Sequence, residues 1–372
     1  METVMTDAEK SRQVSVEPSA KPERVLMKGN EAIAEGAIRS GCQAYFGYPI
    51  TPQSEILEYM SRRMPELGRV FLQAESELAA INMVYGAAAA GFRVMTSSSG
   101  PGISLMQEGL SFIATAELPA VVVNVMRAGP GLGGILPGQA DYFQATKGGG
   151  HGDYRLITLA PNSVQEAMDL TAEAFDLADK YRNPVMILAD GLIGQMMEPV
   201  EIKQYPQNVP AKPWALRGCV GRDKNFIRTL YLAPEPLEAL NRKLEKKYQV
   251  IAANEVRYQE YLLDDAEIAV VAYGTSSRVA QTAVRWARKE GIKAGLLRPV
   301  SLYPFPRHRL QEIAKRVHAV LVVEMSLGQM LEDVERAVCE RVPVRLYSRL
   351  GGSVPVASEV LGVINDMVGR SK

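Results

Sequence analysis

The chain is poor in cysteine and histidine. Its 372 residues include only three cysteines, which lie far apart and show no C-x-x-C spacing: Cys42, Cys219 and Cys339. A disulfide framework is therefore not expected, and this chain by itself cannot supply the four cysteines of an ordinary iron–sulfur cluster. None of its three histidines has the paired spacing of metal ligands, so we predict no metal site in this chain.

Charge and hydrophobicity exclude two further classes of protein. Lys plus Arg and Asp plus Glu each total 42, so no net charge points to nucleic acid or to an anionic membrane. No run of about 18 consecutive apolar residues occurs, which predicts no membrane span. Residues 1–24 are polar and lack the apolar core of a secretory signal, so we interpret them as a flexible tail. We expect a cytoplasmic protein of a reducing compartment.

From residue 30 onwards, short apolar runs alternate with amphipathic segments. The predicted strands are residues 44–48, 70–73, 93–98, 119–128, 154–160 and 184–190. The predicted helices are residues 30–42, 51–64, 76–91, 102–117 and 163–181. Buried strands separated by helices are typical of a mostly parallel, doubly wound α/β sheet, and we place this domain at residues 25–200.

The second half begins with a connector. Residues 201–266 are irregular and rich in proline at first, and they then enter a long charged segment. This segment predicts a helix over 235–267, either continuous or interrupted. Leu237, Leu240 and Leu244 lie on one face of that predicted helix. The α/β alternation resumes at Ile268 and predicts a smaller second domain at residues 267–372, with its own sheet.

The run GPGLGG at residues 129–134 matches the G-x-G-x-x-G pattern of dinucleotide-binding folds. No amphipathic helix follows at once, so the pyrophosphate-binding helix N-terminus of those folds is missing. We therefore interpret residues 129–153 as a long glycine-rich active-site loop, because such loops are usually functional or disordered. His151 within it is a weaker candidate. Ser98 and Ser99 precede a predicted helix but lack the G-x-S-x-G motif of a hydrolase.

Thr51 has two interpretations. As the N-cap of the predicted helix it would precede Pro52 at the first helical position, with Glu55 in the first turn near the positive end of the helix dipole. It also follows a predicted strand almost directly, and ligands of α/β folds bind at the carboxyl ends of strands. The residues themselves leave both roles open.

Glu77 lies at the start of the predicted helix 76–91, where a carboxylate is stabilised by the helix dipole. That helix is apolar nearly all round, which predicts that it is buried. A carboxyl in such surroundings can hold or share a proton near neutral pH, as acid–base chemistry requires. The residues alone do not decide between a structural and a chemical role.

Five motifs follow one another along the chain: YPITPQSE, QAESELAAINMVYGAAAAG, TSSSGPGISLMQEGLSF, VNVMRAGPGLGG and QADYFQATKGGGHGDYRLI. Together they resemble the α subunit of 2-oxoacid:ferredoxin oxidoreductases, above all the branched-chain (3-methyl-2-oxobutanoate) and 2-oxoglutarate enzymes. The resemblance extends from about Val25 to the end of the chain. It implies a pyrimidine-binding domain of the thiamine diphosphate type, followed by a domain similar to the transketolase C-terminal domain.

The resemblance also implies roles for single residues. Glu77 matches the glutamate that hydrogen-bonds N1′ of the aminopyrimidine ring of thiamine diphosphate, and Tyr48 and Pro49 are implied to bind the same cofactor. Thr51 and Arg127 match the residues that bind the substrate carboxylate, which a guanidinium can hold through two hydrogen bonds. By this resemblance Thr51 both caps the helix and faces the substrate.

The activity implied is coenzyme A-dependent oxidative decarboxylation of a 2-oxo acid to acyl-CoA and CO2, with reduction of ferredoxin. The likeness favours 3-methyl-2-oxobutanoate over 2-oxoglutarate. The distal carboxylate of 2-oxoglutarate would need a second cation, for which Lys147 and Arg155 are candidates. Two alternatives stay open, a half-site subunit of a non-oxidative thiamine-dependent decarboxylase and a non-catalytic scaffold subunit.

The resemblance implies partner subunits. The chain has no G-D-G segment for a Mg²⁺-bound diphosphate and no cluster cysteines. We therefore expect a β subunit that carries the Mg²⁺–diphosphate half-site and an iron–sulfur cluster. A γ subunit and, as an optional member, a ferredoxin-like δ subunit would complete the hetero-oligomer.

Overall fold

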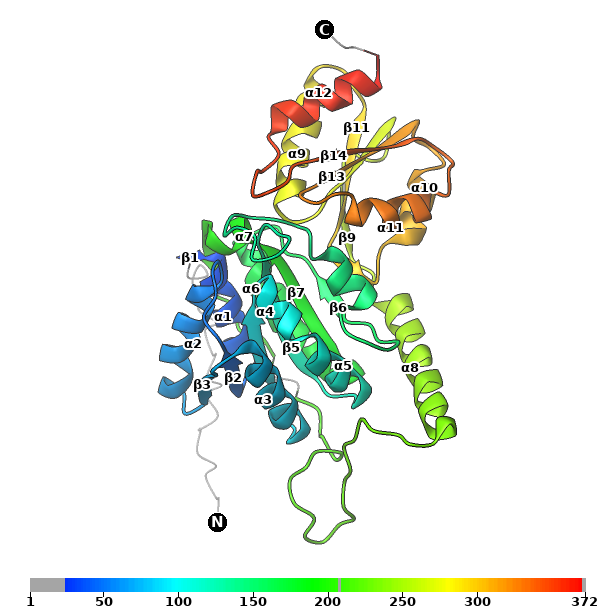
Figure 1. Ribbon diagram of the computed structural model, residues 1–372. Helices are drawn as coiled ribbons and strands as arrows, with labels where there is room; N and C mark the ends of the chain where they lie inside the picture. Colours follow the sequence, from blue (N-terminus) through cyan, green and yellow to red (C-terminus); the bar gives the residue numbers. More distant parts are fainter. Residues whose placement is uncertain (1–23, 207–208, 370–372) are drawn as a thin grey trace, which may run out of the picture.

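Two β-sheets, one above the other and each flanked by helices, form the body of the molecule (Figure 1). The computed structural model describes residues 24–206 and 209–369. The predicted tail lies outside them except for Arg24. Within the described residues, no helix has both the length and the apolarity needed to cross a lipid bilayer.

The larger sheet has seven strands in the order β12-β6-β7-β5-β4-β2-β3. Their bounds are β2 (Ala44–Gly47), β3 (Val70–Gln73), β4 (Val94–Ser98), β5 (Ala120–Met126), β6 (Ile157–Leu159), β7 (Pro184–Asp190) and β12 (Ser301–Tyr303). All pairs are parallel except β12 with β6. Every residue of β4, β5 and β7 is buried, as expected for parallel strands covered on both faces.

Helices cover both faces of this sheet. One face packs against α1 (Gly29–Arg39), α2 (Ser54–Glu66) and α6 (Val164–Tyr181). The other face packs against α3 (Glu77–Ala89), α4 (Pro101–Leu105) and α5 (Gln107–Thr115). Alternate residues of β5 therefore enter different clusters, Val121 and Val123 the first and Val122 the second. The predicted doubly wound sheet is confirmed.

The prediction of a single helix over residues 102–117 is wrong in one respect, because the structure has two helices there, α4 and α5. The N–H of Met106 donates to the carbonyl of Ile103 at 3.1 Å, and this tighter turn interrupts the α-helical hydrogen bonding between α4 and α5.

The smaller sheet has the order β14-β13-β10-β11-β9, with only β9 antiparallel to its neighbour. Its strands are β9 (Tyr258–Tyr261), β10 (Ile268–Val271), β11 (Ala294–Pro299), β13 (Ala319–Glu324) and β14 (Val344–Ser348). Its helices are α9 (Gly274–Lys289), α10 (Arg307–Ile313), α11 (Gln329–Val338) and α12 (Ala357–Met367). The predicted domain bounds stay a prediction. Strand β12 belongs to the second half of the chain, yet it pairs with β6 of the larger sheet.

The connector differs from the expectation. The long predicted helix ends early, as α8 (Pro234–Asn254), because the following residues form β9 and pair with β11. The buried face of α8 consists of Leu244, Tyr248 and Ile251, whereas Leu237 is 38% exposed. The sequence also did not predict α7 (Gly191–Gln195) or the antiparallel pair β1 (Arg24–Lys28) and β8 (Met197–Glu201), nor did it predict β12, α10 and α12.

Gln139 joins the two sheets through a buried polar cluster. Its side-chain Nε2 donates to the carbonyl of Tyr273 at 3.0 Å, and its Oε1 accepts from Ser276 Oγ at 2.9 Å and from the Met325 N–H at 3.0 Å. Its own N–H donates to the Met325 carbonyl at 2.9 Å. Gln139 is fully buried and lies in the glycine-rich loop, so these bonds hold that loop against the smaller sheet.

We predict that Gln139→Leu lowers the free energy of unfolding by about 2–5 kcal/mol, because it leaves several buried polar groups unpaired. The exposed Gln281 on α9 gives a matched control, and Gln281→Leu should change stability by less than about 0.5 kcal/mol. Urea unfolding of the purified variants measures both. Equal stability of the two variants would show that Gln139 does not hold the sheets together.

Candidate active site

Four neighbouring segments end at one edge of the larger sheet. Strands β5, β4, β2 and β3 are adjacent and parallel, so the residues at their carboxyl ends are brought together. These residues are Arg127 after β5, 98–102 at the end of β4, 48–51 after β2, and Glu77 at the start of α3. All five predicted site residues, Tyr48, Pro49, Thr51, Glu77 and Arg127, lie at this edge.

Glu77 is the first residue of α3 and is only 5% exposed. Its helix is capped by Ser76, whose Oγ accepts from the Ala79 N–H at 3.2 Å. Ser98 Oγ donates to Glu77 Oε1 at 3.2 Å, and among the described residues no cation lies within ion-pair distance of the carboxylate. Glu77 is therefore a buried carboxylate held by one neutral donor.

Gly102 makes room for this carboxylate. A Cβ atom at Gly102 would overlap both Ser98 Oγ and Glu77 Oε1. Glycine is thus required where the start of α4 passes the Glu77 side chain, and no larger residue fits without displacing the carboxylate.

The prediction that α3 is buried all round is wrong. Leu78 is 45% exposed, and Asn82 and Gly86 on the same face are also exposed. Only the face that carries Glu77, Ile81 and Val84 packs against the rest of the chain. The apolar residues of the helix do not distinguish these two faces, which is why the sequence did not reveal the difference.

Arg127 is 7% exposed and is held by main-chain carbonyls. Its Nη1 donates to the carbonyl of Thr51 at 3.0 Å and its Nη2 to that of Leu132 at 2.9 Å. Its Nε is buried and has no hydrogen-bond partner. Gly100 lies beside it, since a Cβ atom there would be 3.2 Å from Nε. The guanidinium is therefore fixed, and one buried donor is available.

Thr51 does not cap α2, so that prediction is wrong. The helix begins at Ser54 and its N-cap is Gln53, because the Pro52 carbonyl is held outside the helix by Asn30 Nδ2 at 2.7 Å and Gln195 Nε2 at 2.9 Å. Thr51 is exposed, and its carbonyl, rather than its hydroxyl, contacts Arg127.

A chain of hydrogen bonds holds the loop between β2 and α2 in place. Gln53 Nε2 donates to the Tyr48 carbonyl at 3.3 Å, Ser97 Oγ donates to Gln53 Oε1 at 2.6 Å, and Tyr45 OH lies 2.6 Å from Ser97 Oγ. Tyr48 and Pro49 are themselves exposed at the top of this buried chain of polar groups. Their side chains are therefore accessible to a ligand or a partner.

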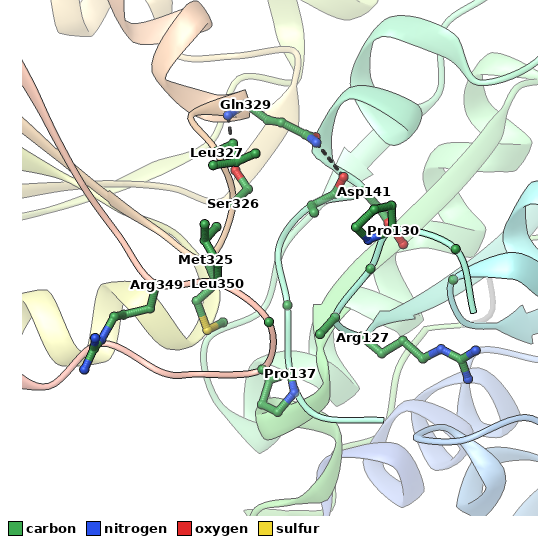
Figure 2. Close-up of a pocket in the computed structure, with 18 of the residues that line it drawn as sticks. Arg127, Pro130, Pro137, Asp141, Met325, Ser326, Leu327, Gln329, Arg349 and Leu350 are labelled. Atoms are coloured by element: carbon green, nitrogen blue, oxygen red, sulfur yellow. Dashed lines mark hydrogen bonds between the residues drawn. The ribbon is translucent and has the colours of Figure 1, made fainter. Parts of the chain in front are cut away.

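A cavity of about 840 Å³ lies beside Arg127 (Figure 2). One wall is Arg127 with the glycine-rich loop, and the opposite wall comes from the second half of the chain at residues 325–329 and 349–352. Gln329 joins the walls, since its Nε2 donates to the Ala140 carbonyl at 2.6 Å and its Oε1 accepts from the Phe143 N–H at 2.8 Å. Both sheets thus contribute to the cavity.

The predicted active-site loop, residues 129–153, lines the cavity only in its first part. Several residues from 128 to 141 line the cavity, but residues 144–148 form a π-helical turn (Gln144–Gly148) that the sequence did not predict. Asp141 on the cavity wall accepts from Asn124 Nδ2 at 2.9 Å. Burial raises the pKa of Asp141, and the Asn124 hydrogen bond and the Arg127 charge only partly oppose this.

Three other candidates lie away from the cavity. Lys147 pairs with Asp333, and Arg155 donates to the carbonyls of Lys147 and Tyr154 at 3.0 and 3.1 Å. His151 is exposed and contacts the Phe112 ring edge-on at 5.9 Å. Among the described residues, no group of three or more His, Cys, Asp or Glu side chains could hold a metal ion.

Two family models match the chain. Residues 35–216 match the model described as pyruvate flavodoxin/ferredoxin oxidoreductase, thiamine diphosphate-binding, and residues 266–360 match core domain II of pyruvate:ferredoxin oxidoreductase. The ketoisovalerate oxidoreductase subunit VorB of Methanothermobacter marburgensis is 56% identical over 93% of this chain and 98% of its own length. The chain belongs to the 2-oxoacid:ferredoxin oxidoreductase family. The predicted resemblance is confirmed.

Some members of the family are more distant. The 2-oxoglutarate synthase subunit KorA of Methanothermobacter thermautotrophicus is 38% identical over 93% of this chain and 99% of its own. These relatives are subunits of 2-oxoacid oxidoreductases, so the chain is a subunit of a multi-subunit enzyme of this family.

Solved structures agree with the fold. A 2-oxoglutarate:ferredoxin oxidoreductase from Magnetococcus marinus, with 2-oxoglutarate, coenzyme A and succinyl-CoA bound, has a TM-score of 0.83 and 26% identity over 98% of this chain and 68% of its own. A split-gene transketolase has a TM-score of 0.57 at 13% identity over 92% of this chain and 98% of its own, a likeness of fold alone.

Sequence reasoning missed part of this site. It considered Ser98 only as a weak nucleophile, whereas the side chain donates to Glu77. It did not predict that Gly102 packs against Glu77. It also did not predict the wall at residues 325–329 and 349–352, which is far from Arg127 along the chain. The G-P-G run at residues 100–102 is a signal that could have indicated close packing at the start of α4.

We predict that Gly102→Ala lowers the oxidoreductase activity of the assembled enzyme by more than about tenfold, because the added methyl group displaces the Glu77 carboxylate from its position. Gly86→Ala on α3, where a Cβ atom meets no other atom within 4 Å, is the control and should leave activity unchanged. Steady-state rates at matched subunit content measure the effect. Full activity of Gly102→Ala would contradict the described role of this glycine.

Proposed function

We propose that this chain supplies the half-site that binds the pyrimidine end of thiamine diphosphate and the carboxylate of a 2-oxo acid. The observation that carries the proposal is that the buried Glu77 carboxylate and the fixed Arg127 guanidinium lie at the same edge of the larger sheet. Tyr48 and Pro49 would lie beside the cofactor ring, and Thr51 would contact the substrate beside Arg127.

The Glu77 site fits an aminopyrimidine ring. A buried carboxyl without a counter-ion, held by a single hydroxyl donor, can exchange a hydrogen bond and a proton with a ring nitrogen. The described residues provide no acidic cluster for a metal–diphosphate group. The donor set therefore fits the pyrimidine end of the cofactor, and the Mg²⁺–diphosphate end is assigned to a partner.

Each residue then has a physical task. Thiamine diphosphate, when bound, supplies the nucleophilic carbon and the electron sink that decarboxylation needs. Glu77 would share a proton with the pyrimidine ring through a carboxyl oxygen, and the hydrogen bond from Ser98 keeps the Glu77 side chain in one orientation. Arg127 presents its unpartnered Nε–H while its two terminal nitrogens are tied to Thr51 and Leu132, so its position does not depend on the substrate.

The overall reaction proposed is oxidative and needs other subunits. A 2-oxo acid and coenzyme A yield acyl-CoA, CO2, one proton and two electrons, and the electrons reduce ferredoxin one at a time. A β subunit would bind Mg²⁺ and the diphosphate and carry an iron–sulfur cluster, with a γ subunit and an optional ferredoxin-like δ subunit. The Magnetococcus marinus enzyme, which binds coenzyme A, supports this scheme.

The substrate we favour is 3-methyl-2-oxobutanoate. The cavity walls beside Arg127 are mostly glycine, proline, alanine and apolar side chains, which suits a branched aliphatic group. The second cation on the wall, Arg349, is paired with Glu359 at 2.7 Å, and neither Lys147 nor Arg155 lines the cavity. The 56% identity to a ketoisovalerate oxidoreductase subunit supports the same substrate.

We predict that Glu77→Gln lowers kcat of the assembled enzyme by about 10² or more, since an amide cannot transfer the proton. Glu75→Gln, at an exposed carboxylate two residues away, is the matched control and should be neutral. The assay is coenzyme A-dependent reduction of a viologen dye with 3-methyl-2-oxobutanoate, 2-oxoglutarate and pyruvate. Unchanged kcat in Glu77→Gln would refute its role, and preference for 2-oxoglutarate would refute the substrate.

A further inference from the structure

A second cavity, of about 820 Å³, lies between α8, β12, α10, α11 and the π-helical turn. It shares no lining residue with the cavity beside Arg127. Figure 1 shows α8, α10 and α11 on the same side of the molecule. We call it the basic cavity, because its charged lining residues are Lys147, Arg155, Arg307, Arg309, Arg336, Glu312 and Asp333.

The lining of the basic cavity has more cationic than anionic side chains, although the chain as a whole has no net charge. Both carboxylates of the lining already form ion pairs with cations of the same lining. Asp333 pairs with Lys147, and Glu312 pairs with Arg309 at 2.8 Å. Across residues 24–206 and 209–369, no carboxylate lies within ion-pair distance of the remaining cations, Arg155, Arg307 and Arg336.

Arg155 is held in place without being neutralised. One of its nitrogens, Nη1, donates to two main-chain carbonyls, and Asn183 Nδ2 donates to the Arg155 carbonyl at 3.0 Å. Arg155 and Arg336 also line an adjoining cavity of about 880 Å³. Arg155 and Arg336 therefore lie at the boundary between the two cavities. An anion at this boundary could contact both arginines.

Aromatic side chains form another part of the lining. Tyr258 is 40% exposed, and Tyr303 and Phe305 are half-buried. Aromatic rings beside unneutralised arginines suit a ligand that combines a planar base with phosphate groups, because the base can stack while the guanidinium groups bind phosphate oxygens. The volume is within the range of sites for such ligands.

We propose that the basic cavity binds a nucleoside polyphosphate, with its phosphates on Arg155, Arg307 and Arg336 and its base against the aromatic residues. This chemistry can come from a free adenine nucleotide or from the nucleotide end of coenzyme A. The site is separate from Glu77 and Arg127, so its test does not depend on the proposed catalytic roles.

Isothermal titration of the assembled enzyme with ADP, pyrophosphate and adenosine tests the proposal. ADP should bind more tightly than pyrophosphate, and adenosine least. Arg155→Ala and Arg336→Ala should each raise the Kd for ADP at least about tenfold, the loss expected for one charge-assisted contact. Arg285→Ala, at an exposed arginine of α9 outside both cavities, is the control and should leave the Kd unchanged.

Competition identifies the source of the nucleotide. Displacement of ADP by coenzyme A, with weaker displacement in Arg155→Ala, assigns the site to coenzyme A, and no displacement assigns it to a free nucleotide. An ADP Kd that is the same in all three variants, or pyrophosphate that binds as tightly as ADP, would overturn the proposal. So would a hexaglutamate peptide that displaces ADP at lower concentration, because the cavity would then recognise an acidic protein.

Discussion

A buried carboxylate without a counter-ion is the constraint on which the site depends. Removing Glu77 from water costs free energy, and one neutral hydrogen bond from Ser98 offsets only part of that cost. The fold accommodates this group because Glu77 is the first residue of α3, at the carboxyl edge of the sheet, and because Gly102 leaves space beside its carboxylate. An aminopyrimidine ring nitrogen would give the carboxylate the partner that the chain itself does not provide.

The second half of the chain serves the same site from a distance. Gln139 and Gln329 attach the glycine-rich loop to the end of β13 and the start of α11, so the loop is positioned although it has little regular structure. Residues 325–329 and 349–352 then close the cavity beside Arg127. The second sheet is therefore needed to complete this cavity.

Much of the fold could be predicted from the sequence, because strands such as β3 and β7 are short apolar runs with clear ends. The parallel sheet then places Glu77 and Arg127 at one edge without further information. The exceptions depend on distant contacts. The start of α2 is set by Asn30 and Gln195, which lie far from Pro52 in sequence. The end of α8 is set by the pairing of β9 with β11. The roles of Glu77, Arg127 and Thr51 came from the family motifs and not from periodicity.

We propose that this chain holds only one half of a thiamine diphosphate site. The most direct measurement is calorimetric titration of thiamine diphosphate with Mg²⁺ into this chain alone, into its diphosphate-binding partner subunit alone, and into the two combined. Tight binding is expected only for the combined subunits. Binding to this chain alone with the affinity of the combined subunits would contradict the proposal.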